Sequence, residues 1–262
     1  MTETPWIVRF APISSPAHRL FCFPYAGIGS SLYRLWPKLV PDGVEICAIL
    51  PPGREGRIRE KAMESIDEIC DALLPALTPW LDRPFSFFGH SLGALVAFES
   101  ARRIRTALGR LPETLFVSAR IAPHLPSSSP SIHHLSDALF IEAMKKRYGG
   151  IPDVILQSPD LMALFLPVMR ADMKAVETYL YREDAPLECP IMAFAGTRDA
   201  VADERGVRAW SMHTTSGFDF RAIEGDHFFV QSARAKVAGE VSSALGKQGT
   251  GIDPDAHAKG GG

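Results

Sequence analysis

The stretch "FFGHSLGALVAFESARR", residues 87–103, places a serine between two glycines where an apolar run gives way to a helical pattern. The segment from Gly89 to Gly93 fits the G-x-S-x-G pattern, in which a serine sits on a sharp strand-to-helix turn with its hydroxyl exposed. The small residues Gly93 and Ala97 would let the following helix approach the strand closely. We therefore expect Ser91 to be a nucleophile, and the alternative is a serine that only fills a structural corner.

Composition favours one globular domain without a strongly charged partner. The chain has 262 residues, of which 46% are hydrophobic, and a formal net charge of −2. This content is enough for a large core, and the charge balance does not favour nucleic acid or an anionic membrane surface as a partner. We find neither a basic, apolar leader nor a run of about 18 apolar residues, so we expect a cytoplasmic protein without a membrane span. The four cysteines are scattered without metal-ligand spacing, which predicts reduced, buried side chains.

Short apolar runs alternate with helical patterns along most of the chain. Strands are predicted at 19–24, 44–50, 84–89, 113–119, 189–196 and 218–223. Helices are predicted at 63–79, 92–108, 203–211 and 230–246. This alternation, with strands that are apolar on both faces, predicts an α/β fold with a mostly parallel central sheet flanked by helices.

About 70 residues separate two neighbouring strands where a crossover usually needs far fewer. A helix capped by Ser136 is predicted at 136–150, and a second helical stretch, interrupted or kinked at Pro167, at 158–181. We expect an α/β core at 1–118 and 187–246, with an inserted helical lid at 119–186. The glycine-rich tail, 247–262, is expected to be disordered.

A serine nucleophile needs a histidine base and a carboxylate that orients the base. Among the late histidines, only His227 lies just after a strand, at a loop that opens a helix; His213 falls in a helix end and His257 in the tail. Asp199 follows the preceding strand and is the expected acid, with Asp203 and Asp226 as alternatives. His90, next to the serine, is expected to be structural.

Two backbone amides are expected to bind the developing oxyanion. One belongs to Leu92, the residue after the nucleophile. The other belongs to Ala26, in the loop "PYAGIGSS" (24–31), where glycines permit close approach of the backbone. A nucleotide-binding loop is a poor alternative because the G-x-G-x-x-G pattern is incomplete.

Several blocks in order resemble the type II thioesterases associated with polyketide synthases and non-ribosomal peptide synthetases, which belong to the α/β-hydrolase superfamily. The blocks are "LFCFPYAGIGSSLYRLWP" (20–37), "PPGREGRI" (51–58), the serine segment, "LFLPVMRADMKAVETY" (164–179) and "GDHFFV" (225–230). The resemblance covers roughly residues 15–245. It implies a triad of Ser91, Asp199 and His227 and an oxyanion hole at the amides of Ala26 and Leu92.

The resemblance also implies the reaction, which is hydrolysis of stalled or aberrant acyl thioesters from the phosphopantetheine arm of an acyl or peptidyl carrier protein. No cofactor is expected, and no metal is expected because the pair His133-His134 lacks further ligands at metal spacing. A monomer is expected. The alternatives are a general serine esterase, a fatty-acyl thioesterase acting on acyl carrier protein or coenzyme A, and a catalytically silent binding protein with the same fold.

The lid supplies candidate substrate contacts. Met162, Phe165, Met169 and Met173 have adaptable side chains that can line an acyl chamber, although packing onto the core explains any one of them equally well. The basic run 145–147 fits either an acidic carrier protein or a solvated helix end. Arg54 can pair with a carboxylate near the floor of the site or stiffen its own loop.

Overall fold

The computed structural model describes residues 3–127, 129–149 and 157–248. Within this part of the chain the strands form one seven-stranded sheet in the order β1-β3-β2-β4-β5-β6-β7. The strands are β1 Ile7–Val8, β2 His18–Phe23, β3 Val44–Ile49, β4 Phe85–His90, β5 Leu115–Ser118, β6 Ile191–Gly196 and β7 Phe218–Ile223. Only β1 pairs antiparallel, at the edge beside β3, and the remaining strands are parallel. The predicted mostly parallel sheet is therefore confirmed, while the two-residue β1 was too short to be predicted.

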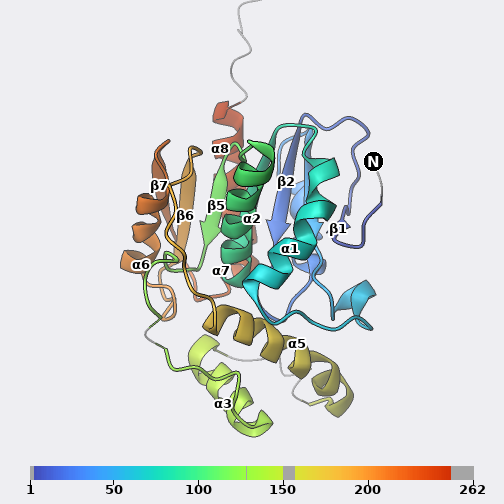
Figure 1. Cartoon of the computed structure of the whole chain (residues 1–262), viewed down its shortest axis with the longest axis vertical. Helices are drawn as coiled ribbons and strands as arrows, with labels where there is room; N and C mark the ends of the chain where they lie inside the picture. Colours follow the sequence, from blue (N-terminus) through green and yellow to red (C-terminus); the bar gives the residue numbers. More distant parts are fainter. Residues whose placement is uncertain (1–2, 128, 150–156, 249–262) are drawn as a thin grey trace, which may run out of the picture.

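Helices cover both faces of this sheet (Figure 1). The α-helices of the core are α1 Ile66–Leu77, α2 Leu92–Leu108, α6 Glu204–Arg208, α7 Phe229–Ser232 and α8 Arg234–Gln248. The 3-10 helices are η1 Ser30–Tyr33, η2 Trp36–Lys38, η3 Glu55–Arg57, η4 Thr78–Trp80 and η5 Ala209–His213. Two predicted helices are shorter than expected, because 203–211 divides into α6 and η5 and 230–246 divides at Ala233 into α7 and α8.

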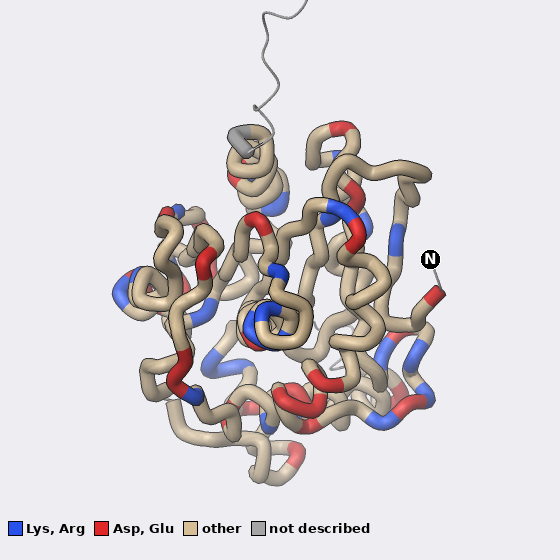
Figure 2. The backbone as a smooth tube through the Cα atoms, turned by 45° about the horizontal axis from the view of Figure 1, so that its top comes forward, with Lys and Arg blue, Asp and Glu red and all other residues tan. Residues whose placement is uncertain are grey.

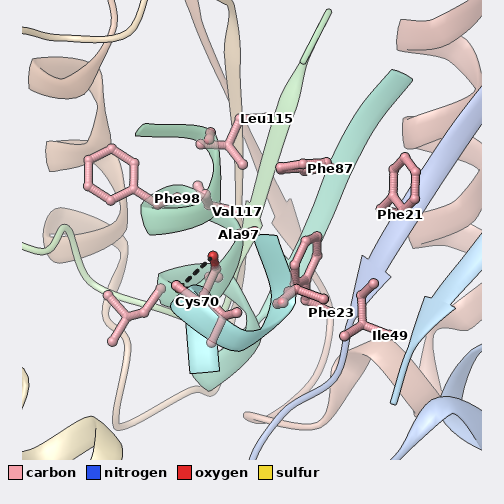
Figure 3. Packing of buried hydrophobic residues seen from close by; sticks show 14 of the residues in the cluster. Phe21, Phe23, Ile49, Cys70, Phe87, Ala97, Phe98, Leu115 and Val117 are labelled. Carbon is pink, nitrogen blue, oxygen red and sulfur yellow. Dashed lines mark hydrogen bonds between the residues drawn. The ribbon is translucent and has the colours of Figure 1, made fainter. Parts of the chain in front are cut away.

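The core lies in two layers, one on each side of the sheet. Side chains of α1, α2 and η5 pack on one face, and those of η1, η2, α7 and α8 pack on the other. Figure 3 shows the first layer, where Phe21, Phe87 and Val117 lie along the sheet near Ala97 and Phe98 of α2. Alternate residues of β2 serve the two layers, with Phe21 in one and Cys22 in the other. Burial on both faces explains why these strands read as continuous apolar runs rather than as alternating ones.

Two further helices, α3 Asp137–Tyr148 and α5 Pro159–Glu177, lie between β5 and β6 in sequence. In Figure 1 they lie beyond the edge of the sheet at which the parallel strands end. They share a small apolar cluster that includes Phe140 and Met144 of α3 and Met169 and Met173 of α5. The lid predicted at 119–186 corresponds in position to this pair of helices.

The lid helices differ from expectation in two details. The expected interruption at Pro167 is absent, since α5 runs through this residue as one helix; the proline removes a single hydrogen-bond donor, and the buried Val168 and Met169 hold the next turn against the protein. Ser136 occupies the N-cap of α3 but its side chain makes no capping hydrogen bond, whereas the Ser158 hydroxyl accepts one from the amide of Leu161 in α5. Most of the expected disordered tail, 249–262, lies outside the described residues, and residues 247–248 end α8.

Charge is spread over the chain rather than gathered on one side, and Figure 2 shows acidic and basic positions interspersed along the tube. Within the described residues, no helix combines the length and apolar character that crossing a bilayer requires.

Candidate active site

Ser91 lies on a strained turn between β4 and α2. Its backbone has φ 55° and ψ −113°, in the left-handed half of conformational space that residues with a side chain rarely occupy. The two flanking glycines make the turn possible. A Cβ on Gly89 would stand 2.2 Å from the carbonyl oxygen of Gly93, and a Cβ on Gly93 would stand 2.2 Å from the carbonyl oxygen of Phe23. Close packing of α2 on the sheet therefore presents the Ser91 hydroxyl at the end of the strands.

His227 and Asp199 complete a hydrogen-bonded chain with Ser91. His227 Nε2 lies 3.0 Å from Ser91 Oγ, and His227 Nδ1 lies 2.8 Å from Asp199 Oδ2. Asp199 follows β6, and His227 lies in the loop between β7 and α7. Parallel strands that end at one edge thus bring together three side chains that are far apart in sequence. The geometry allows His227 to accept the serine proton while Asp199 accepts a hydrogen bond from its other ring nitrogen.

Asp199 is held as a carboxylate. Burial by itself would raise the pKa of Asp199, but hydrogen bonds from His227 and from the amides of Val201 and Ala202 outweigh it, so the pKa lies below its usual value. The alternative acids have other partners. Asp203 caps α6 by accepting from the amide of Gly206, and Asp226 accepts from the amide of Phe228.

His90 forms a hydrogen bond with the backbone of the loop that carries His227. It is fully buried, and this burial, followed by the nearby His227, lowers the pKa of His90 to about 3, so the ring is neutral. Its Nε2 lies 2.8 Å from the backbone carbonyl of His227, and its Nδ1 lies 2.9 Å from the hydroxyl of Ser118. A carbonyl only accepts, so Nε2 carries the proton and Nδ1 accepts from Ser118. The ring therefore fixes the backbone of His227 and has no bond to the Ser91 hydroxyl, in keeping with a structural residue.

The other late histidines lie elsewhere. His213 is buried against His124, with 2.7 Å between His124 Nδ1 and His213 Nε2, and burial lowers the pKa of His213 to about 4. His257 falls outside the described residues.

The two expected oxyanion donors lie beside the serine. Leu92 is the first residue of α2, where an amide has no partner within its own helix. Ala26 follows β2 and lines the same cavity as Ser91. In the part of the chain that the structure describes, neither amide donates a backbone hydrogen bond, so both remain free to meet a developing negative charge.

Two cavities meet at Ser91. The first, which we call the apolar chamber, has a volume of about 350 Å³. Besides Ser91 and His227 it is lined by Tyr25, Ala26, Ile28, Met144, Tyr148, Phe165, Met169, Met173, Val176, Phe228 and Gln231. Phe165, Met169 and Met173 of the four predicted lid residues line it, whereas Met162, three residues before Phe165 on α5, lines neither cavity. The helical pattern alone could not separate Met162 from the three, because the choice depends on how α5 is rotated above the sheet.

The second cavity, which we call the polar chamber, has a volume of about 460 Å³. It shares Ser91, His227, Tyr148, Met173 and Val176 with the apolar chamber. Its other walls include the charged groups of Arg120, Arg147 and Glu177 and the side chains of His124, Tyr179 and Tyr181. The serine therefore lies where a substrate can extend in two directions.

A buried ion pair ties the lid to this site. Arg54, in the loop after β3, reaches Asp172 of α5 at 2.7 and 2.9 Å through its two terminal nitrogens. Asp172 also accepts from the amide of Gly27, the neighbour of Ala26, at 2.7 Å. Arg54 was predicted to pair with a carboxylate or to stiffen its loop, and the structure shows the pair. Among the described residues, no group of three or more His, Cys, Asp or Glu side chains is arranged to hold a metal ion.

Comparisons with known proteins agree with this architecture. A model of the thioesterase domain family matches residues 18–245. The chain is 38% identical to the gramicidin S biosynthesis protein GrsT of Aneurinibacillus migulanus, over 88% of this chain and 90% of that protein. It is 39% identical to the thioesterase PikA5 of Streptomyces venezuelae, over 94% and 89%. The structure of BorB, a type II thioesterase from the borrelidin biosynthetic cluster, superimposes with a TM-score of 0.83 at 33% identity and covers 94% of this chain and 98% of BorB.

Proposed function

The chain belongs to the thioesterase family, among the type II thioesterases of polyketide and non-ribosomal peptide biosynthesis, and we propose that Ser91, His227 and Asp199 are its catalytic triad. The family resemblance read from the sequence is thereby confirmed. The observation that carries the proposed triad is the hydrogen-bonded chain from Ser91 Oγ through His227 to Asp199, at 3.0 and 2.8 Å.

The acylation step follows from these distances. His227 Nε2 takes the proton of Ser91 as its oxygen attacks the thioester carbonyl, and the amides of Ala26 and Leu92 bind the resulting oxyanion. Collapse of this intermediate breaks the carbon–sulfur bond, and the leaving sulfur takes the proton from His227 Nε2, so that a thiol is released and the imidazole is neutral again. A thiol with a pKa near 8.5 needs less proton delivery than an amine, so this step suits a thioester.

Deacylation reuses the same groups. His227 removes a proton from water, which attacks the acyl-serine, and the carboxylic acid leaves as the Ser91 hydroxyl is restored. Asp199 holds the ring of His227 in the tautomer that this exchange needs and stabilises its charged form.

The substrate is proposed to be an acyl group on the phosphopantetheine arm of an acyl or peptidyl carrier protein, removed when it is stalled or aberrant. The support is the pathway context of GrsT and BorB, together with a serine that lines two chambers. We further propose that α3 and α5 act as a lid, and that the enzyme works as a monomer in the cytoplasm.

The test is hydrolysis of an acetyl or propionyl group from a phosphopantetheinylated carrier protein, followed by mass spectrometry. The matching coenzyme A thioester and a simple aryl ester are run in parallel, with Ser91→Ala as the control. We expect faster release from the carrier protein and a loss of at least about 10⁴-fold in the variant. Equal or faster turnover of the free thioester or the aryl ester would favour a general hydrolase, and an active Ser91→Ala protein would refute the triad.

A further inference from the structure

Arg120 lines the polar chamber, and among the described residues its guanidinium group has no hydrogen-bond acceptor. Arg120 is the second residue after β5, and its backbone carbonyl is fixed by a 2.8 Å hydrogen bond from the indole of Trp210. Its side chain lines the same cavity as Ser91 and His227. Its Nε is buried and unpaired, and nothing within the described residues accepts a hydrogen bond from its guanidinium.

This arrangement is energetically unusual. Burial lowers the pKa of Arg120, and the titratable groups that act on it are the phenols of Tyr148 and Tyr179, which are neutral near pH 7. An arginine nevertheless keeps its charge in a protein, so the chamber contains a cation that forms no ion pair with any carboxylate of the described residues. Arg120 is half-buried, and a partly desolvated charge without an ion-pair partner is costly unless something else in the working protein compensates it.

Three arginines that are more deeply buried than Arg120 each have a carboxylate partner. Arg19 pairs with Glu45, Arg54 with Asp172 and Arg57 with Glu60. Arg147, the second arginine of the polar chamber, lies 3.3 Å from Glu177. Arg234 also has an unpaired Nε, but it lines neither chamber. Within the described residues, Arg120 is thus a cation without an ion-pair partner in the cavity that Ser91 also lines.

A guanidinium fork is matched by two oxygens that share a negative charge, as in a carboxylate or a phosphate. We propose that Arg120 forms an anion-binding subsite in the polar chamber, which pairs with a carboxylate or phosphate group of the thioester substrate. This proposal rests on the function proposed above, because it takes the reacting thioester to lie at Ser91.

Two parts of such a substrate can supply the anion. The phosphate of the arm lies roughly 15 Å from the sulfur when the arm is extended, judged from the reach of an extended chain. A carboxylate on a short acyl chain, as in a malonyl group, lies within a few bonds of the carbonyl. The polar chamber is lined by Ser91 and also by Leu180, which is 82% exposed, so it connects the nucleophile with the protein surface and is open to both sources.

Binding to the full chain carrying Ser91→Ala separates the two sources. Titration calorimetry compares three ligands: acetyl-pantetheine, acetyl-phosphopantetheine and malonyl-pantetheine. We expect one of the two anionic ligands to bind at least about tenfold more tightly than acetyl-pantetheine, as a charge-assisted hydrogen-bond pair would give. A second variant, Ser91→Ala with Arg120→Gln, should lose that advantage and bind acetyl-pantetheine unchanged.

Each outcome has a defined meaning. An advantage for the phosphorylated ligand assigns the subsite to the arm, and an advantage for the malonyl ligand assigns it to the acyl group. The proposal is overturned if neither anionic ligand binds more tightly, or if Arg120→Gln leaves the advantage intact or weakens all three ligands by one factor. Arg120→Lys keeps the charge without the fork and should retain part of the advantage, which guards against misfolding of the glutamine variant.

The exposed Arg208→Gln, on α6, is the matched control for the loss of one positive charge and should change nothing. The same titration distinguishes a failure of the proposed function from a failure of the Arg120 proposal. Hydrolysis of the ligands by the Ser91→Ala protein would refute the triad and would say nothing about Arg120.

Discussion

Asp172 of α5 accepts hydrogen bonds from both Arg54 and the amide of Gly27, so one carboxylate of the lid holds the loop that carries Ala26. Gly27 has φ 81°, and a Cβ there would stand 2.8 Å from the side chain of Met169 on the same helix. The conformation of this loop therefore depends on α5 being seated. The proposed oxyanion hole and the proposed lid are therefore linked through one carboxylate.

Replacement of Asp172 by asparagine should uncouple them. The variant leaves the buried Arg54 without a counter-charge, which costs about 3–5 kcal/mol of the free energy of unfolding. It also loosens the hold on Gly27, so we expect kcat to fall by about tenfold to a hundredfold while KM changes little, because an oxyanion donor acts on the transition state. Steady-state kinetics at a temperature where the variant is folded measures both constants.

Lys174 supplies the control on the same helix. Its ammonium group pairs with Glu64 at 2.6 Å, but both side chains are more than 40% exposed. Such a pair contributes about 0–1 kcal/mol, so Lys174→Gln should leave kcat and stability nearly unchanged. If Lys174→Gln lowered kcat as much as Asp172→Asn, the effect would belong to the seating of α5 in general and not to the Gly27 contact.

The two aspartates after β6 should differ sharply in their effect on turnover. Asp199→Asn keeps the shape of the side chain but allows the wrong tautomer of His227, and in triads of this kind that change lowers kcat by about 10⁴. Asp203→Ala removes only the cap of α6, so it should cost about 1 kcal/mol of stability and leave kcat intact. Turnover of an acyl carrier protein by both variants checks the assignment, which fails if Asp203→Ala is the inactive one.

The sequence patterns of strands and helices were enough to predict the candidate site residues that follow the ends of parallel strands. Ser91, Asp199 and His227 each follow a parallel strand, so the alternation of strands and helices was enough to place all three at one edge of the sheet. The turn at Ser91 was also predictable, because only small residues fit the 2.2 Å approaches at Gly89 and Gly93.

The remaining features depend on contacts that no local pattern encodes. Arg54 and Asp172 are 118 positions apart, and nothing near either residue indicates the other. Arg120 was not predicted as a site residue, because it stands out only by having no hydrogen-bond acceptor among the described residues, which the sequence does not reveal. The choice between Met162 and Met169 as a wall of the apolar chamber depends on the rotation of α5 over the sheet, which packing determines.

His90 should make the protein sensitive to mild acid. The pKa of its buried ring is lowered to about 3, whereas an unfolded histidine has a pKa near 6.5. Below pH 6.5 the His90 ring is therefore protonated in the unfolded state but not in the folded state. The free energy of unfolding falls as the pH is lowered, until the ring in the folded state also becomes protonated near pH 3. Between pH 7 and pH 5 this single group costs about 2 kcal/mol.

Urea unfolding at the two pH values tests this expectation. His90→Gln keeps a donor that can face the carbonyl of His227 but cannot titrate, so it should lose about 2 kcal/mol less than the natural chain between pH 7 and pH 5. Equal losses in the two proteins would show that His90 is not the acid-sensitive group.

Two glycine-to-alanine substitutions should act in opposite directions. At Gly93 the new methyl group would meet the backbone of Phe23 and Pro24 at 2.2–2.7 Å, and backbone cannot move aside as a flexible side chain can. The substitution would push α2 away from the loop that leads to Ala26, so we expect a loss of at least about 3 kcal/mol and little activity in any soluble fraction. At Gly239, on the exposed face of α8, a methyl group meets nothing within 4 Å. Alanine there should stabilise the helix by up to about 1 kcal/mol without changing kcat. Thermal unfolding of both variants beside the natural chain measures the contrast, and a well-folded, active Gly93→Ala protein would contradict the tight turn on which the position of Ser91 depends.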